Sequence, residues 1–457
     1  MDKVYFRKTG FIGDTTLAYK SFKIYAAFCY WIYNRRTKVL HKERIPKKKA
    51  IIFAPIHNNA VMDAMAVLHH CGRDAVFVAR ADAFTHPFVL RILTTFKMLP
   101  IYRMRDGASE LQRNEEIFNT TVEVLKRGHT FGIMPEGSHG YKRRLRPFVK
   151  GIFRIAFRAQ EDHKEEEFLY IVPVGIDYSH YVNFRPKVLI CFGHPIPVNE
   201  YWAEYEEHPA RAINSIRKRM IDEFMENIIH IESEDYYEMY MSLREIYNGT
   251  MRRHLGFRRK NLETKFRADQ QMIHTLYEEE KTNRDRITEL AEKVSHFTAG
   301  VKKLGSRLWV FNRKNYSFFL LLPLSVLMIA GLPLFLYGLI NNIISYKVSN
   351  LMSPRFKDVQ FHSTVKYVFG LAVIPFIYLF QFALVAIFAP GPGWIKWVYL
   401  ASLLPAGIFA HEYFICLKKM RSLWKYWFLT VTRDKNLKNL KALRDEIIAD
   451  TDLIVRK

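Results

Sequence analysis

The sequence is poor in cysteine, with four among 457 residues: Cys29, Cys71, Cys191 and Cys416. They lie far apart and show no paired spacing of the kind that zinc sites use. We therefore expect reduced, mostly buried thiols in a protein that faces the cytosol. The N-terminus also lacks an apolar core followed by a small-residue cleavage site, so no cleavable signal peptide is expected.

Acidic residues are scarce relative to basic ones: 45 Asp and Glu stand against 69 Lys and Arg, which gives a net charge of +24. Such a balance suits an anionic partner, either nucleic acid or a membrane surface. The sequence has no zinc-finger, RNP or helix-turn-helix pattern, whereas residues 315–417 are hydrophobic. We therefore expect a membrane partner and no nucleic acid.

A histidine and an aspartate follow the apolar run Ala50–Pro55, which predicts a buried strand. They are His57 and Asp63, in the stretch IHNNAVMDA. An imidazole titrates near neutral pH and can take a proton from an alcohol, and a nearby carboxylate can hold its tautomer and stabilise the imidazolium. A capped helix start would also carry such a pair, so the pair alone leaves both interpretations open.

Three further blocks follow in order. LPIYRMR carries Arg103 and Arg105, TFGIMPEGSHGYKRR places Glu136 in a Pro-Glu-Gly turn, and YIVPVGIDY predicts a buried strand, Leu169–Gly175, that ends in a Pro-Val-Gly bend. Each block alone has a plainer interpretation. The arginines can be solvated charges at a strand end, Glu136 a surface turn residue, and the basic cluster 142–146 a contact with solvent or anionic lipid.

The four blocks in this order resemble the glycerophospholipid acyltransferase family of the phosphatidate-synthesis type. That family shows N-H-x4-D, a Gly-x-Ile-x-Arg type block, F-P-E-G-T-R-S and V-P-V. The corresponding segments here are IHNNAVMD, PIYR, MPEGSH and IVPVG, and the lysine of the family's F-x-K-G segment matches Lys150. The resemblance covers roughly Ile45 to Val198, and four ordered blocks are more specific than any one of them.

The resemblance implies that His57 deprotonates a glycerol hydroxyl, which attacks an acyl thioester, while Asp63 orients His57. Backbone N–H groups at the helix start after Asn58 are expected to stabilise the oxyanion, and Glu136 to accept a hydrogen bond from the glycerol hydroxyl. No metal or cofactor is expected; the donor is acyl-CoA or acyl carrier protein. The residues expected to bind substrate are Arg103, Glu136, Gly137, Ser138 and Lys150, and further candidates for phosphate contacts are Arg105, His139, Lys142 and Arg143.

Two departures from the family pattern stand out. Five residues, rather than four, separate His57 from Asp63, and we expect the extra residue to be absorbed in the turn, with Asn58 or Asn59 as N-cap. Fungal glycerol-3-phosphate acyltransferases are members that carry this longer spacing. His139 replaces the arginine of F-P-E-G-T-R-S, so the grip on the acceptor headgroup must differ in detail.

The expected fold is an α/β acyltransferase domain, a mixed sheet flanked by helices, over residues 45–200. A helix from Ser109 to Arg127 has a C-cap signal in Gly128. Residues 1–44 contain an aromatic, basic stretch that suits an interfacial helix or, equally, a helix packed on the domain. The expected strands are Ala50–Pro55, Ala75–Ala79, Met98–Tyr102, Thr130–Met134, Leu169–Gly175 and Lys187–Phe192.

Beyond residue 200 we expect a charged helical extension (201–312), a membrane region (313–417) and a basic cytoplasmic tail (418–457). The membrane region predicts a re-entrant or hairpin segment at 316–344, broken by Pro323 and Pro333, and two spans at 367–390 and 394–417. Three simple spans would put the basic segments on opposite sides, against the positive-inside rule, which is why a bent first segment is expected.

The sequence thus predicts a multi-pass membrane acyltransferase with its catalytic domain on the cytoplasmic face. The preferred acceptor is 1-acyl-sn-glycerol-3-phosphate, in phospholipid biosynthesis. Glycerol-3-phosphate is the alternative acceptor, favoured by the longer spacing. A phospholipid-remodelling acyltransferase and a non-catalytic lipid-binding scaffold are the rival functions; the latter would be expected to lack His57 or Asp63, and both are present.

Overall fold

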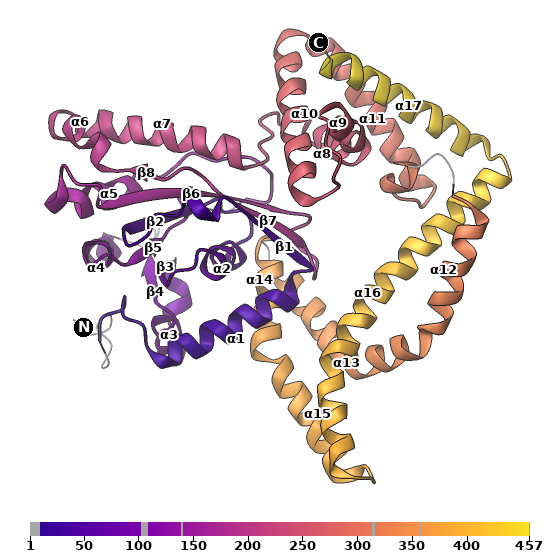
Figure 1. Ribbon diagram of the computed structural model, residues 1–457, viewed down its shortest axis with the longest axis horizontal. Coiled ribbons are helices and arrows are strands. Elements are labelled where there is room, and N and C mark those ends of the chain that lie inside the picture. The colour runs from indigo at the N-terminus through magenta and orange to yellow at the C-terminus, as the bar shows by residue number, and fades with distance from the viewer. Residues whose placement is uncertain (1–9, 102–107, 139, 313–315, 357, 457) are drawn as a thin grey trace. The chain divides into compact units, whose positions relative to one another are not determined.

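The computed structural model describes residues 10–101, 108–138, 140–312, 316–356 and 358–456 (Figure 1). They divide into two compact units. The first comprises Met1–Ile229 with Met352–Leu371, and the second His230–Leu351 with Ala372–Lys457. The α/β unit therefore extends beyond the expected range 45–200 at both ends, and it also takes in a segment from the expected membrane region.

An eight-stranded mixed sheet forms the centre of the first unit, within the described residues. Its order is β1-β7-β6-β2-β5-β3-β4, with β8 paired to β6. Within the group β2 to β6, all paired strands are parallel. Strands β7 and β8 are antiparallel to β6, and β1 is parallel to β7. The strands are β1 (Arg36–Leu40), β2 (Ala50–Pro55), β3 (Ala75–Arg80), β4 (Met98–Ile101), β5 (Thr130–Gly132), β6 (Leu169–Tyr178), β7 (Lys187–Phe192) and β8 (Ile196–Pro197).

Helices cover both faces of this sheet (Figure 1). Helices α4, α5 and α7 pack together on one face, while α2 lies on the other with α1 against it. The helix predicted at Ser109–Arg127 is confirmed as α4, and Gly128 follows it with φ +73°. The helices of this unit are α1 (Leu17–Tyr33), α2 (Val61–His70), α3 (Pro87–Thr95), α4 (Ala108–Lys126), α5 (Gly151–Gln160), α6 (Trp202–Glu207) and α7 (Pro209–Asn227), with the first part of α14 (Phe361–Ala372).

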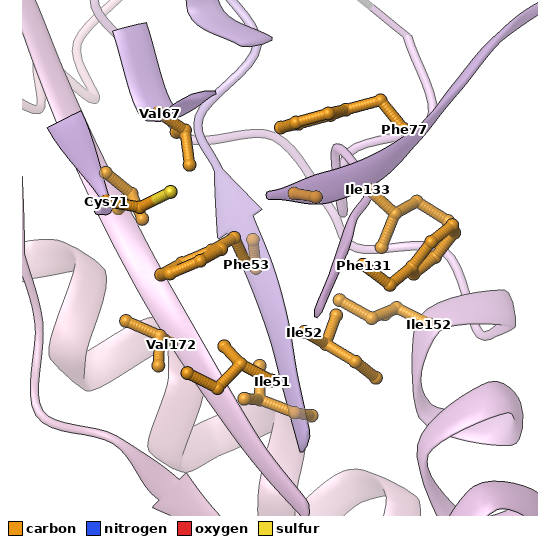
Figure 2. Packing of buried hydrophobic residues seen from close by; sticks show 14 of the residues in the cluster. Ile51, Ile52, Phe53, Val67, Cys71, Phe77, Phe131, Ile133, Ile152 and Val172 are labelled. Carbon is orange, nitrogen blue, oxygen red and sulfur yellow. The ribbon is translucent and has the colours of Figure 1, made fainter. Parts of the chain in front are cut away.

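The core is built around β2, every residue of which is buried. Figure 2 shows Ile52 pointing toward Ile152 of α5, and Phe53 toward Val67 of α2. A parallel strand covered on both faces reads as a continuous apolar run, which is why the sequence predicts β2 with its bounds. β1 was missed because its part-exposed residues, at the edge of the sheet, form no such run.

The second unit is helical. Helix α17 packs on α10 and α11 and buries Leu437, Leu440 and Ile447. The segment expected as a basic tail, 418–457, holds the end of α16 and the packed helix α17. Its cytoplasmic location stays a prediction. The helices are α8 (Tyr237–Ile246), α9 (Asn248–His254), α10 (Leu262–Thr282), α11 (Arg284–Lys303), α12 (Phe318–Ala330), α13 (Leu332–Met352), α15 (Ile374–Phe388), α16 (Gly393–Val431) and α17 (Lys435–Val455).

Two helices of the described chain are long and apolar enough to cross a membrane: Phe361–Phe388, formed by α14 and α15, and Gly393–Val431, which is α16. A third span results if the bent pair α12 and α13 counts as one. Helices α12 and α13 meet at an angle of 50° at Gly331. This break lies between Pro323 and Pro333, the two prolines expected to interrupt the segment. The interruption predicted in 316–344 is therefore present.

Gly175 corrects the expected end of β6. The strand continues through it to Tyr178, so the Pro-Val-Gly bend is wrong. Gly175 is needed for a close approach: a Cβ there would lie 1.8 Å from the carbonyl oxygen of Asn227, the last residue of α7. The end of α7 thus packs directly on the backbone of the strand next to β2.

We predict that Gly175→Ala lowers the free energy of unfolding by about 3 kcal/mol, because a backbone carbonyl has little room to move away. Gly151→Ala is the matched control, since a Cβ at Gly151 meets nothing within 4 Å. We expect that control to change stability by less than about 1 kcal/mol. Denaturant unfolding in detergent measures both, and equal stability of the two variants would contradict the prediction.

Candidate active site

The candidate site begins where β2 leaves the sheet. β2 lies between β5 and β6, and residues 56–60 form a loop between its carboxyl end and α2. Ile56 N donates to Val174 O of β6 (3.0 Å), and His57 O accepts from Gly140 N (3.2 Å). The loop is therefore tied to the neighbouring strand and to the turn after β5. The carboxyl ends of parallel strands are the usual ligand-binding edge of such sheets.

His57 and Asp63 face each other across this loop. His57 Nδ1 lies 3.5 Å from Asp63 Oδ2, and the aspartate side chain is fully buried, whereas that of His57 is 18% exposed. His57 Nδ1 is itself buried. Nε2 is then the nitrogen left to exchange a proton with a substrate, while Asp63 stabilises the charge that the ring gains. The structure thus brings the two predicted catalytic residues together.

The extra residue between them sits in a strained turn. Ala60 has φ +46° and ψ −124°, in a region that costs a residue other than glycine about 1–3 kcal/mol. It is the residue that precedes α2, and it makes no side-chain cap, so the expected N-cap at Asn58 or Asn59 is wrong. The expected absorption of the extra residue in this turn fits the structure.

Asp63 is held from the loop side as well. Asn59 N donates to Asp63 Oδ2 at 2.6 Å, so this N–H is engaged and does not serve as the expected oxyanion donor. The hydroxyls of Tyr30 and Tyr178 lie within electrostatic range of the carboxylate. Burial raises the pKa of both well above the usual tyrosine range, and the charge of Asp63 raises it further. Both phenols therefore stay protonated next to Asp63.

Glu136 ties the loop of His57 to the turn after β5. Its fully buried carboxylate accepts from His57 N (2.8 Å) through Oε2, and from Arg146 N (2.8 Å) through Oε1. The guanidinium of Arg146 donates to Oε2 (2.8 Å) and also to His57 O (2.7 Å). Glu136 and Arg146 thus fix both backbone groups of His57.

This arrangement gives Glu136 a different part from the expected one. A carboxylate with no exposure and with both oxygens occupied holds the backbone of His57 and offers no exposed oxygen to a substrate hydroxyl. In the sequence, Arg146 stands out only as a member of the basic cluster 142–146. The available signal was indirect: a glutamate that is buried needs a cation close by, and Arg146 lies within the same block.

Arg143 was expected as a phosphate contact, but it is buried. Its Nε lies 3.0 Å from the carboxylate of Asp177 on β6, and it also donates to the Tyr178 carbonyl. It therefore connects the segment after Glu136 to β6. Arg143 Cζ also lies 5.1 Å from the ring centroid of Tyr181, which adds a cation–π contact.

The other predicted substrate contacts fall into two groups. Gly137, Ser138 and Lys150 are exposed, and Lys142 is partly exposed, so these residues are accessible to a substrate. Arg103, Arg105 and His139 lie outside the described residues, and their contacts stay predictions. Among the residues that the structure describes, no group of three or more His, Cys, Asp or Glu is arranged to hold a metal ion. The expectation of a metal-free reaction stays a prediction.

We predict that Glu136→Gln lowers the free energy of unfolding by about 3 kcal/mol, because it leaves the buried end of Arg146 without its countercharge. Glu161→Gln is the control, since Glu161 pairs with Arg158 (3.5 Å) on the surface, where such pairs contribute little. Denaturant unfolding measures both variants. Equal losses would show that burial of the Glu136–Arg146 pair has no special effect.

Comparisons with known proteins match the part of the chain that carries the His57–Asp63 pair. The acyltransferase family model matches residues 36–177, which include β1 and the whole His57 loop. Glycerol-3-phosphate O-acyltransferases 1 and 2 of Saccharomyces cerevisiae are 25% and 24% identical to this chain over 136 and 135 residues. Each match covers 29% of this chain but only 18% of the yeast protein.

A solved structure is also similar, the 1-acyl-sn-glycerophosphate (LPA) acyltransferase PlsC from Thermotoga maritima. It is 20% identical, with a TM-score of 0.33, and the match covers 45% of this chain and 79% of that chain. The family assignment depends on the sequence match of residues 36–177 and on the His57–Asp63 geometry within them. This part of the chain, residues 36–177, is therefore similar to acyltransferase domains, and it carries the His57–Asp63 pair.

Proposed function

We propose that this protein is a membrane-bound O-acyltransferase of glycerolipid synthesis. In this proposal it moves a fatty acyl group from a thioester, acyl-CoA or acyl carrier protein, to a hydroxyl of glycerol-3-phosphate. The observation that carries the proposal is the buried Asp63 facing His57 at the carboxyl end of β2, inside an acyltransferase-family domain. This arrangement supports a general-base role for His57, with Asp63 orienting its ring.

The choice of acceptor comes from two observations. The yeast relatives are named glycerol-3-phosphate O-acyltransferases, and the five-residue spacing between His57 and Asp63 favours the same acceptor. This choice revises the preference for 1-acyl-sn-glycerol-3-phosphate that the sequence alone suggested. Lysophosphatidate is kept as the competing acceptor in the experiment below.

The proposed reaction is a single displacement through a tetrahedral intermediate. His57 Nε2 accepts the proton of the glycerol hydroxyl as its oxygen bonds to the thioester carbonyl carbon. Asp63 stabilises the imidazolium from the Nδ1 side. The intermediate collapses, the C–S bond breaks, and the thiolate takes the proton from His57. The products are the acyl ester and the free thiol of the donor.

Two accessible lysines between Glu136 and α5 suit the acceptor phosphate. Lys150 precedes α5, and Lys142 lies in the segment after Glu136. Ser138, with the backbone of Gly137, is an exposed polar group in the same turn. We assign the phosphate to these residues, because a dianion is bound by lysine charge and by hydroxyl or N–H donors.

To test the function, purified protein in detergent would be given radiolabelled acyl-CoA or acyl carrier protein with glycerol-3-phosphate or lysophosphatidate. We expect transfer to glycerol-3-phosphate, lowered about 10²–10⁴-fold in His57→Ala, because the general base is lost. His163→Ala is the control, since His163 also faces a carboxylate, Glu166 at 3.2 Å, but on the surface. Transfer that survives in His57→Ala would contradict the mechanism, and transfer to lysophosphatidate alone would overturn the acceptor.

The proposed location is the membrane, with several passes and the catalytic unit on the cytoplasmic face. The spans Phe361–Phe388 and Gly393–Val431 support it, as do the basic residues Lys418, Lys419 and Arg421 after the apolar part of α16. If the bent pair α12–α13 is re-entrant, the chain before Phe361 and the chain after Leu417 lie on the same side.

We expect a single cysteine at Lys347, in a variant without the four native cysteines, to react with an impermeant maleimide only after the cells are permeabilised. A cysteine at Ala389, in the link between the two spans, is the control and should react from outside in intact cells. Labelling of position 347 in intact cells would contradict the re-entrant arrangement.

A further inference from the structure

A residue from the start of a candidate membrane span reaches the catalytic loop. Ser363, on α14, is 1% exposed, and its hydroxyl donates to Asn59 Oδ1. Asn59 N donates in turn to Asp63 Oδ2 (2.6 Å), the oxygen that faces His57 Nδ1. More than three hundred residues separate Ser363 from Asn59 in the chain, yet both belong to the first compact unit.

Several contacts within the first unit fix α14 in this place. Tyr367 Oη donates to Ala26 O (2.9 Å) and Tyr25 Oη to Leu371 O (2.6 Å), which joins α14 to α1. Lys366 Nζ donates to Val182 O (3.0 Å), beyond the end of β6. The ring of Tyr367 also packs edge-on against Tyr30 and Tyr33. The direction of the Ser363 hydroxyl is therefore set by α14, which α1 holds on one side and the segment after β6 on the other.

The loop needs such support. Ala60 holds a strained conformation, and strain of this kind persists only where the surroundings over-determine it. Asn59 is 1% exposed, so its amide oxygen needs a donor inside the protein, because a buried acceptor without a donor destabilises the fold. Ser363 supplies that donor and so fixes the residue whose N–H holds Asp63.

We propose that Ser363 is a positioning residue of the acyl-transfer site: it acts through Asn59 and Asp63 to orient His57, so that the membrane-spanning segment itself completes the site. The inference rests on the proposed function for the reaction that it assists. Its consequence is that residues 36–177 are not sufficient for full activity, because part of the orienting network begins the span Phe361–Phe388.

The test is kinetic and uses the full chain. Ser363→Ala should lower kcat about tenfold, the effect of losing one oriented hydrogen bond of roughly 1.4 kcal/mol, and leave KM for the acceptor unchanged. Ser363→Thr keeps the hydroxyl and should restore most of kcat. Thr364→Val is the matched control, since it removes a buried hydroxyl one residue away that has no hydrogen-bond partner among the described residues, and it should keep parental kcat.

The pH profile separates positioning from simple loss of structure. In Ser363→Ala the carboxylate of Asp63 is held less firmly against His57, so the imidazolium loses stabilisation and the acid limb of the kcat profile moves to lower pH. The other ionisable groups at the pair are Glu136 and Arg146, which bond to the backbone of His57, and Tyr30 and Tyr178, which face Asp63. None of these contacts involves Ser363, so these four groups should affect the pH profile of Ser363→Ala as they affect that of the parent.

The outcomes are distinct. If the parent and His57→Ala both lack transfer, the proposed function fails. If the parent is active and Ser363→Ala keeps its kcat and pH profile, or loses kcat only as much as Thr364→Val, the positioning role is overturned. If thermal unfolding shows that Ser363→Ala does not fold, Ser363→Cys decides, because its weak S–H donor predicts a kcat between those of the parent and an inactive chain. Parental kcat in that variant would overturn the proposal.

Discussion

The site depends on the buried carboxylate of Glu136. A buried charge is tolerated only with a countercharge and with hydrogen-bond donors, and Arg146 and His57 N supply them. In satisfying Glu136, the fold fixes the backbone of His57 on both sides, since Arg146 also donates to the His57 carbonyl. The Pro-Glu-Gly turn and the histidine loop follow strands β5 and β2, which are neighbours in the sheet, so their pairing brings the two blocks together.

A second set of contacts orients the ring of His57. Asp63 lies in the first turn of α2, and its carboxylate meets both His57 Nδ1 and the N–H of Asn59. The strained Ala60 accommodates the longer spacing between the catalytic pair, and α14 covers the loop through Ser363. Glu136 therefore fixes the backbone position of His57, while Asp63 and Asn59 fix the orientation of its ring. The proposed base is oriented by residues from three parts of the chain: Asp63 on α2, Glu136 after β5 and Ser363 on α14.

Much of this could be predicted from the sequence, for physical reasons. Strands that are buried on both faces are continuous apolar runs, so β2 and β7 were predicted with their bounds, and the ordered blocks located His57 and Asp63. The part played by Glu136 could not be read from its turn, because a Pro-Glu-Gly turn is equally compatible with an exposed side chain. Ser363 gave no signal at all: it lies just before the expected span 367–390, and its contact with Asn59 exists only in the folded chain.

The most direct test of the central claim is a competition experiment. The purified full chain would receive one acyl donor together with equal glycerol-3-phosphate and lysophosphatidate, and mass spectrometry would identify the products for the parent and for Asp63→Asn. The acyl donor carries an isotope label, so that the monoacyl product of glycerol-3-phosphate differs in mass from the added lysophosphatidate. We expect the labelled monoacyl product from the parent and its near-complete loss in Asp63→Asn, because the amide cannot stabilise the imidazolium of His57. The same product at the same rate from both proteins would contradict a reaction that depends on the His57–Asp63 pair.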